Sequence, residues 1–169
     1  MAFHRLYYHL VWATKNREPF IQVEVETRLY PYLVNKGAEL GVYTYAINGW
    51  VDHIHLVVAI PPKLAVADVV KRLKGASSHD LNHASGMKGN FAWQRGYGAL
   101  TVGEQHRPIA EAYVKRQKEH HQQQSTNAWL ERYNEFDEGP PDTGLEFDTV
   151  PHLVKENSAP YDFLGEPPF

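Results

Sequence analysis

A chain of 169 residues, 43% hydrophobic and 22% charged, has the size and composition of one soluble globular domain and is too short for two. It has no apolar run near the ~18 residues of a transmembrane helix and no visible signal peptide, so a cytoplasmic protein without a membrane partner is expected. The absence of cysteine excludes disulfides and thiolate metal sites, which leaves nitrogen and oxygen ligands for any metal.

The charge is unevenly distributed along the chain. Residues 1–130 carry 15 Lys and Arg against 10 Asp and Glu, a net charge of +5, whereas residues 131–169 carry 2 against 10, a net charge of −8. Such a mild excess does not by itself indicate a nucleic-acid-binding protein. A basic body with an acidic tail does, however, make the overall charge of −3 compatible with one.

The first 60 residues predict three strands and a helix. Residues 5–14 are rich in aromatic and β-branched residues, as strands are. Residues 23–40 have helical apolar spacing, although Pro31 should kink or split that helix. Residues 42–48 and 53–60 are strand-like, and the short polar turn between them predicts an antiparallel hairpin.

The remaining elements are predicted by apolar spacing and by glycine and proline. Residues 66–82 form a helix with one apolar stripe, and residues 85–90 form a loop. Residues 91–103 are strand-like but interrupted by glycines. A helix over 108–123 begins with proline, which suits a first helical turn, and residues 127–136 form a short further helix.

The resulting order, β-α-β-β-α-β-α, predicts an α+β fold: a ferredoxin-like antiparallel sheet with the helices packed on one face. From about residue 139 the sequence becomes acidic and proline-containing, without helical or strand patterns. We therefore expect one domain over residues 1–138 and an irregular C-terminal tail over residues 139–169.

His53-Ile54-His55 lies within the predicted strand 53–60. Residues i and i+2 of a strand project from the same face, so both imidazoles point one way and Ile54 points the other. Paired imidazoles on a rigid strand are good ligands for a divalent metal. Two strand histidines can also form a plain polar solvent face, so the spacing alone leaves both interpretations open.

The predicted helix 108–123 places Tyr113 and Gln117 four residues apart, on one face. A tyrosine there can be a core residue or a nucleophile. A phenol with an ordinary pKa of about 10 needs help to attack at neutral pH. A metal that polarises a phosphate would supply it, with the Gln117 amide oxygen as a further ligand. His120 and His121 are adjacent and point apart, so no shared role is expected for both.

Several stretches of the chain, taken together, are far more specific than any one motif. They are Asp52 followed by His53-Ile54-His55, AYVKRQKEHH (112–121), YYHLVWATKNREPF (7–20), LAVADVVKRLKGASS (64–78) and WQRGYGALTVGE (93–104). In this combination the chain resembles the HUH single-tyrosine transposases of small bacterial insertion sequences, which are related to the REP-associated tyrosine transposases. The resemblance covers about residues 5–125.

The resemblance implies a role for each candidate residue. His53 and His55 would be metal ligands, Gln117 the third ligand and Tyr113 the nucleophile, with magnesium or manganese as the metal. Cleavage of single-stranded DNA would give a 5′-phosphotyrosine and a free 3′-hydroxyl, and rejoining would need no ATP. Such short family members usually act as homodimers on DNA with hairpin ends, and in many the tyrosine helix of one subunit completes the other's site.

Six basic residues are candidates for DNA contact. Four could bind phosphates along a single strand or hairpin, although those on the helix could equally form a solvated face: Lys71, Arg72, Lys74 and Arg95. The resemblance adds Lys15 and Arg17, in the loop after the first strand. The acidic stretch 131–169 does not match the family pattern.

Two other functions are compatible with parts of the sequence. A domesticated relative could bind hairpin DNA without transposition, although the complete set His53, His55, Tyr113 and Gln117 argues against lost chemistry. An unrelated metal hydrolase or oxygenase built on the two histidines would require a carboxylate ligand and would leave Tyr113 and Gln117 unexplained.

Overall fold

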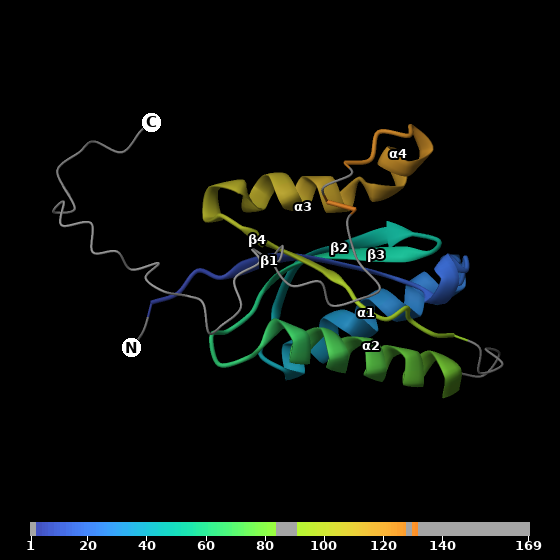
Figure 1. Ribbon diagram of the computed structural model, residues 1–169, viewed down its shortest axis with the longest axis horizontal. Helices are drawn as coiled ribbons and strands as arrows, with labels where there is room; N and C mark the ends of the chain where they lie inside the picture. The colour runs from blue at the N-terminus through green and yellow to red at the C-terminus, as the bar shows by residue number, and fades with distance from the viewer. Residues whose placement is uncertain (1–2, 84–90, 128–129, 132–169) are drawn as a thin grey trace, which may run out of the picture. The chain divides into compact units, whose positions relative to one another are not determined.

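The computed structural model describes residues 3–83, 91–127 and 130–131. Its elements, coloured along the chain in Figure 1, are β1 (Tyr7–Ala13), η1 (Lys15–Arg17), α1 (Val23–Glu39), β2 (Tyr43–Trp50), β3 (His53–Ala59), α2 (Val66–His83), β4 (Gly98–Val102), η2 (Glu104–His106), α3 (Arg107–Lys115) and α4 (Gln117–Gln122). The predicted loop 85–90, most of the predicted helix 127–136 and the predicted tail 139–169 lie outside the described residues. No helix in the described ranges is both long and apolar enough to cross a bilayer.

The four strands form one sheet in the order β2-β3-β1-β4, and every neighbouring pair is antiparallel. This confirms the predicted α+β fold with a ferredoxin-like antiparallel sheet. Strand β3 is central and pairs with β1 on one side and with β2 on the other. His53 and His55 therefore project from a strand that is hydrogen-bonded on both sides.

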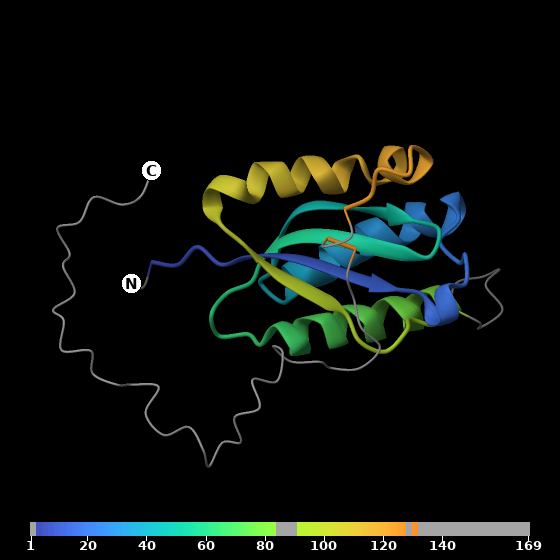
Figure 2. The ribbon, with the colours of Figure 1, turned by 45° about the horizontal axis from the view of Figure 1, so that its top comes forward.

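Helices cover both faces of the sheet, which corrects the prediction that all of them pack on one face. Helices α1 and α2 lie on one face and α3 and α4 on the other, as the two views of Figures 1 and 2 agree. The main apolar core joins α1 and α2 to Ile54, Leu56 and Val58 of β3. A smaller core on the opposite face joins Val57 of β3 to Val114 of α3. Strand β3 is buried on both faces because each face is covered by a pair of helices (Figure 1).

Two elements differ in extent from their prediction. Helix α1 runs unbroken past Pro31, whose side chain is exposed, because Leu29 and Leu33 on either side of it are buried in the main core. Strand β4 begins only at Gly98, and of the residues before it Trp93 makes one isolated bridge to Thr14. Gly96 between them has a φ of +74°, which lies outside the strand region.

The predicted single helix over 108–123 is two helices that meet at Arg116. This residue has φ −99° and ψ 16°, outside the helical region, and its N–H bonds to the carbonyls of Ala112 and Tyr113. Tyr113 thus belongs to α3, whereas Gln117 is the first residue of α4. The helix begins as predicted, with proline in its first turn.

Gly49 is a glycine because β2 and β3 approach too closely there for a side chain. A Cβ at Gly49 would collide with the carbonyl oxygen of His53 and lie 2.8 Å from the Cα of Ile54. We expect Gly49→Ala to lower the free energy of unfolding by about 1–3 kcal/mol. Gly75 in α2 has no neighbour within 4 Å of such a Cβ, so Gly75→Ala should instead add about 0.5–1 kcal/mol. Urea unfolding of both variants measures the contrast, and equal stabilities would contradict it.

Candidate metal and nucleophile site

His53 and His55 project from the same face of β3, as the strand alternation predicts. Their relative exposures are 1% and 0%, so they do not form a polar solvent face. Ile54 between them points into the main core on the other face. The two imidazoles instead lie in the layer between the sheet and helices α3 and α4, where a buried polar group requires a partner.

Each imidazole is held through its Nδ1 atom. His53 Nδ1 is 2.6 Å from Asp52 Oδ1, and Arg17 Nε donates to the other oxygen of Asp52 at 2.7 Å. His55 Nδ1 is 2.9 Å from Nε2 of the buried His9. Partners of this kind fix the ring orientation and tautomer of metal-binding histidines. A proton on each Nδ1 leaves the Nε2 lone pairs available to a metal ion.

Glu131 brings the two histidines and the tyrosine helix together. Its Oε2 atom lies 3.2 Å from Nε2 of His53 and 3.2 Å from Nε2 of His55. Its Oε1 atom accepts hydrogen bonds from Tyr113 Oη at 2.7 Å and from Gln117 Nε2 at 3.1 Å. The predicted residues His53, His55, Tyr113 and Gln117 thus converge within one chain.

The residues present fit a divalent metal. One ligand atom each of His53, His55 and Glu131 lies within 4.8 Å of the other two. Gln117 is fully buried, and its Oε1 atom has no hydrogen-bond partner among the described residues, which leaves a dehydrated amide oxygen beside the cluster. Imidazole nitrogens with carboxylate and amide oxygens are a donor set that suits a divalent metal.

The electrostatics of the site distinguish its two histidines. Burial opposes a charge on His53, but hydrogen bonds to Asp52 and Glu131 outweigh it and raise the pKa of His53. The more deeply buried His55 has a lowered pKa despite its contact with Glu131. Burial also raises the pKa of the Tyr113 phenol above 10.0, so this group carries its proton at neutral pH.

His121 also points at this cluster, a placement that was not expected from the sequence. Its Nε2 lies 3.1 Å from Nε2 of His53, and its ring stacks on Trp50 at 5.1 Å. The signal that identifies it is its spacing of four residues from Gln117, because both lie in α4. Glu131 had no such signal: it lies in the predicted short helix 127–136, and no motif or spacing in the sequence relates it to His53, His55 or Tyr113.

His9 is neutral in the folded protein because burial, and then the nearby His55, lower its pKa from 6.5 to about 3. Between pH 6.5 and pH 3, His9 takes up a proton in the unfolded chain but not in the folded chain. Stability is therefore complete above pH 6.5 and falls as the pH drops toward 3. We expect wild type to lose about 2 kcal/mol more than His9→Gln between pH 7 and pH 5 in urea unfolding. Exposed His83→Gln serves as the control, and an equal loss in His9→Gln would contradict the assignment.

The six predicted DNA-binding residues lie in different places. Arg17 adjoins the site through Asp52, and its neighbour Lys15 is exposed in the same turn η1. Lys74 donates to the carbonyls of Gln94 and Gly96 at 2.7 and 2.6 Å, so it holds the segment before β4, and burial lowers its pKa to about 8. The remaining three are exposed, two of them on α2 at the face opposite α3: Lys71, Arg72 and Arg95.

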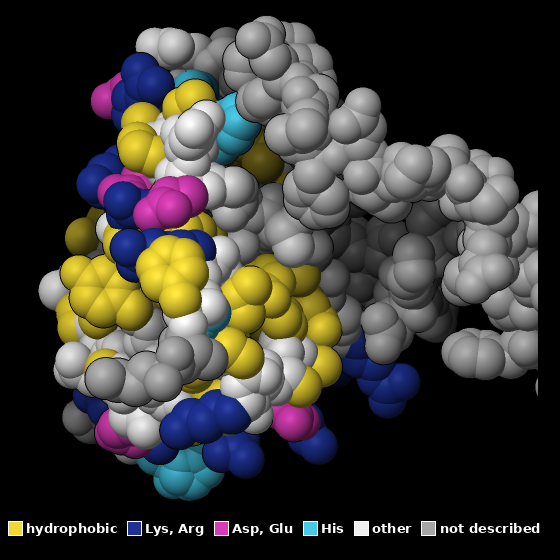
Figure 3. All heavy atoms as spheres, turned by 90° about the vertical axis from the view of Figure 1, so that its left-hand side faces the viewer, with side chains coloured by type: hydrophobic (Ala, Val, Ile, Leu, Met, Phe, Trp, Pro, Cys, Tyr) yellow, Lys and Arg dark blue, Asp and Glu magenta, His cyan; other side chains and the backbone are white. Residues whose placement is uncertain are grey.

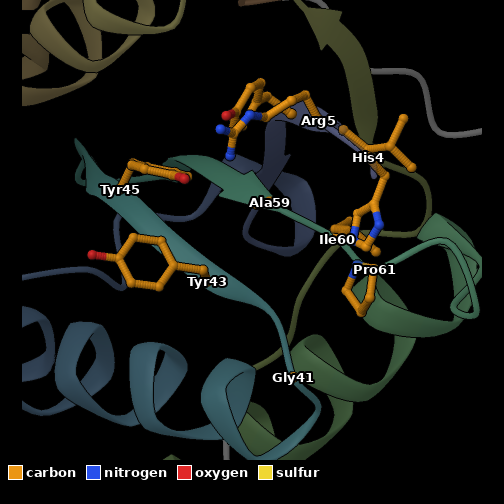
Figure 4. Close-up of a pocket in the computed structure, with 10 residues that line it drawn as sticks. His4, Arg5, Gly41, Tyr43, Tyr45, Ala59, Ile60 and Pro61 are labelled. Carbon is orange, nitrogen blue, oxygen red and sulfur yellow. The ribbon is translucent and has the colours of Figure 1, made fainter. Parts of the chain in front are cut away.

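A pocket lies at the other end of β3 from the histidines. It is lined by residues 4–7, 41, 43, 45 and 59–61, and Figure 4 shows Tyr43 and Tyr45 at its side. Figure 3 looks onto the end of the molecule where β1 begins, and apolar side chains lie there beside Lys and Arg. Arg107 lies 4.2 Å from the Tyr45 ring centroid. None of the predicted site residues lines this pocket.

The site thus places a helical tyrosine and a glutamine beside two buried strand histidines, on a four-stranded antiparallel sheet. Residues 2–117 match the family model described as IS200-like transposase, and the chain belongs to this family.

Curated relatives and solved structures agree with this assignment. The chain is 32% identical over 119 residues to the ISDra2 transposase TnpA of Deinococcus radiodurans, which covers 68% of this chain and 85% of that protein. It is 33% identical over 118 residues to the transposase for insertion sequence element IS200 of Salmonella typhimurium, which covers 66% of this chain and 76% of that protein.

Two solved structures share the fold. A putative transposase from Deinococcus radiodurans aligns with a TM-score of 0.53 and 30% identity over 69% of this chain and 95% of that one. A REP-associated tyrosine transposase bound to a REP hairpin aligns with a TM-score of 0.55 over 72% of this chain and 74% of that one. The two sequences are 12% identical, so this similarity concerns the fold alone.

Proposed function

We propose that this protein cleaves and rejoins single-stranded DNA through a covalent bond to Tyr113, with a divalent metal held by His53, His55 and Gln117. One observation carries the proposal: Tyr113 Oη and Gln117 Nε2 bond to one oxygen of a carboxylate whose other oxygen lies 3.2 Å from both imidazoles. The nucleophile and the candidate ligands therefore surround one point.

The proposed cleavage is a balanced transesterification. Tyr113 loses its phenolic proton, its Oη forms a bond to phosphorus, and the bond from phosphorus to the 3′-oxygen breaks. That oxygen takes up a proton, which gives a 5′-phosphotyrosine and a free 3′-hydroxyl. Because the number of phosphate ester bonds is unchanged, a 3′-hydroxyl can attack the phosphotyrosine and rejoin DNA without ATP.

The metal we propose is magnesium or manganese, which would polarise the phosphate under attack and stabilise the charge that develops there. The chain's own residues orient the site: Asp52 and His9 hold the two imidazoles, and α3 and α4 carry Tyr113 and Gln117 to them. The raised pKa of Tyr113 makes such assistance necessary at neutral pH.

We propose single-stranded DNA with hairpin ends as the substrate and a homodimer as the active form. A hairpin is bound in the solved REP-associated transposase. Arg17 beside Asp52, together with the exposed Lys15, Lys71, Arg72 and Arg95, supplies positive charge for phosphates, whereas Lys74 is bonded to the carbonyls of Gln94 and Gly96. The alternative is a protein that binds hairpin DNA without transposition activity, and the experiment must distinguish it from an active transposase.

A covalent-trapping assay tests the proposal. Labelled single strands carrying hairpins from the flanking genome are incubated with the full chain and Mg²⁺ or Mn²⁺, and adducts are resolved under denaturing conditions. We expect a metal-dependent protein–DNA adduct. Hairpin binding without any adduct would favour the binding-only protein, and multiple-turnover cleavage without an adduct would favour a hydrolase.

A further inference from the structure

We infer that Glu131 is a further ligand of the metal and that the same carboxylate holds the Tyr113 hydroxyl beside the ion. The inference rests on the proposed function and deepens it, because it adds a residue to the ligand set His53, His55 and Gln117. Glu131 lies beyond the residues that match the family model, which end at 117.

The distances around Glu131 Oε2 match those within a coordination shell. This atom lies 3.2 Å from Nε2 of His53 and from Nε2 of His55. Two ligand atoms at right angles around an ion, each bonded at about 2.1 Å, are themselves separated by about 3 Å. The carboxylate oxygen thus stands next to both imidazole nitrogens as a third ligand would.

The charge of Glu131 fits the same role. Its side chain is only 18% exposed, and one of its oxygens accepts hydrogen bonds from Tyr113 and Gln117. A divalent cation beside two neutral imidazoles and a neutral amide lacks an anionic ligand, and a buried carboxylate supplies it. Across the described residues, Glu131 is the carboxylate that joins the histidines in a metal-binding cluster.

The other oxygen of Glu131 acts on the nucleophile. Tyr113 Oη donates to Oε1 at 2.7 Å, and the backbone N–H of Asn127 donates to Tyr113 Oη at 3.0 Å. These two contacts fix the position of the phenolic oxygen and direct its proton toward the carboxylate. Gln117 Nε2 donates to the same Oε1 at 3.1 Å, so one oxygen of Glu131 joins the candidate nucleophile to Gln117.

Two substitutions distinguish the two proposed roles of Glu131, which are to bind the metal and to accept the hydrogen bond from Tyr113. Glu131→Gln removes the charge and retains an oxygen that can accept from Tyr113, whereas Glu131→Ala removes both. Mn²⁺ binding to the full chain without DNA is measured by isothermal titration calorimetry. We expect both variants to bind Mn²⁺ at least about tenfold more weakly than wild type. At saturating Mn²⁺, Glu131→Ala should form the covalent adduct at least about tenfold more slowly than Glu131→Gln.

Glu119→Gln is the matched control, since it removes one exposed carboxylate from α4 and should bind Mn²⁺ as wild type does. Unchanged Mn²⁺ affinity in Glu131→Gln would overturn the inference. Tighter binding would also overturn it, because the carboxylate would then compete with the ion for the imidazoles. If wild type itself forms no adduct on any hairpin strand, the proposed function fails. If wild type forms the adduct and the Glu131 variants match it in Mn²⁺ affinity and adduct rate, only the inference about Glu131 fails.

Discussion

Tyr113→Phe should abolish the covalent adduct while the protein still binds both DNA and metal. The substitution removes one oxygen atom, the nucleophile, from a side chain whose ring remains packed between α3 and the sheet. Loss of a nucleophile that forms a covalent intermediate lowers the single-turnover rate by at least about 10³-fold. Denaturing gels of the labelled strand measure the adduct, and calorimetry with Mn²⁺ measures the metal site separately.

Tyr43→Phe controls for the loss of a phenolic hydroxyl elsewhere on the chain. Tyr43 is 63% exposed and lies on β2 at the pocket end of the sheet, away from the histidines. It should form the adduct at the wild-type rate. If Tyr113→Phe retains the adduct, Tyr113 is not the attacking residue, and the mechanism proposed above is wrong.

His53→Ala should lose metal binding and, with it, metal-dependent cleavage. His53 is one of two imidazoles whose Nε2 atoms adjoin the same carboxylate oxygen, so its removal leaves half of the nitrogen ligands. We expect Mn²⁺ affinity to fall by at least about 100-fold and the adduct to be strongly reduced at any Mn²⁺ concentration below saturation.

The control for this change is His79→Ala, because His79 is exposed on α2, on the other face of the sheet. It stacks on His83 and makes no contact with the site, so its Mn²⁺ affinity should equal that of wild type. The substitution leaves Asp52 and Glu131 with one partner fewer each, so circular dichroism is used to check that His53→Ala remains folded. Wild-type Mn²⁺ affinity in the folded variant would exclude His53 as a ligand.

Local patterns were sufficient for most of the fold. Alternation along residues 53–60 predicted that His53 and His55 share a face, and turn and helix signals predicted the hairpin and the start of α3. The strand order followed from the order of elements, because two βαβ-like halves have few ways to pair. The proline rule failed at Pro31, since packing of Leu29 and Leu33 outweighs the single backbone hydrogen bond that proline removes.

Placement of the helices could not be predicted in the same way. Strand β3 is buried on both faces, but periodicity along the chain does not say which helices cover each face. Val57 of β3 and Val114 of α3 meet only in the folded chain, on the face where His53 and His55 project. This packing carries Tyr113 and Gln117 to the histidines and leaves Lys71 and Arg72 on the other side.

The sequence by itself determined the candidate residues, because residue type and spacing along a strand or helix are local properties. Spacing placed His53 with His55 and Tyr113 with Gln117, and the family resemblance supplied the roles proposed for them. Only the tertiary structure decided which groups hold them: His9 on β1 behind His55, His121 on α4 beside His53, and Glu131 between the imidazoles and the tyrosine. These contacts join residues 18 to 76 positions apart, and chain periodicity carries no information about pairs so distant.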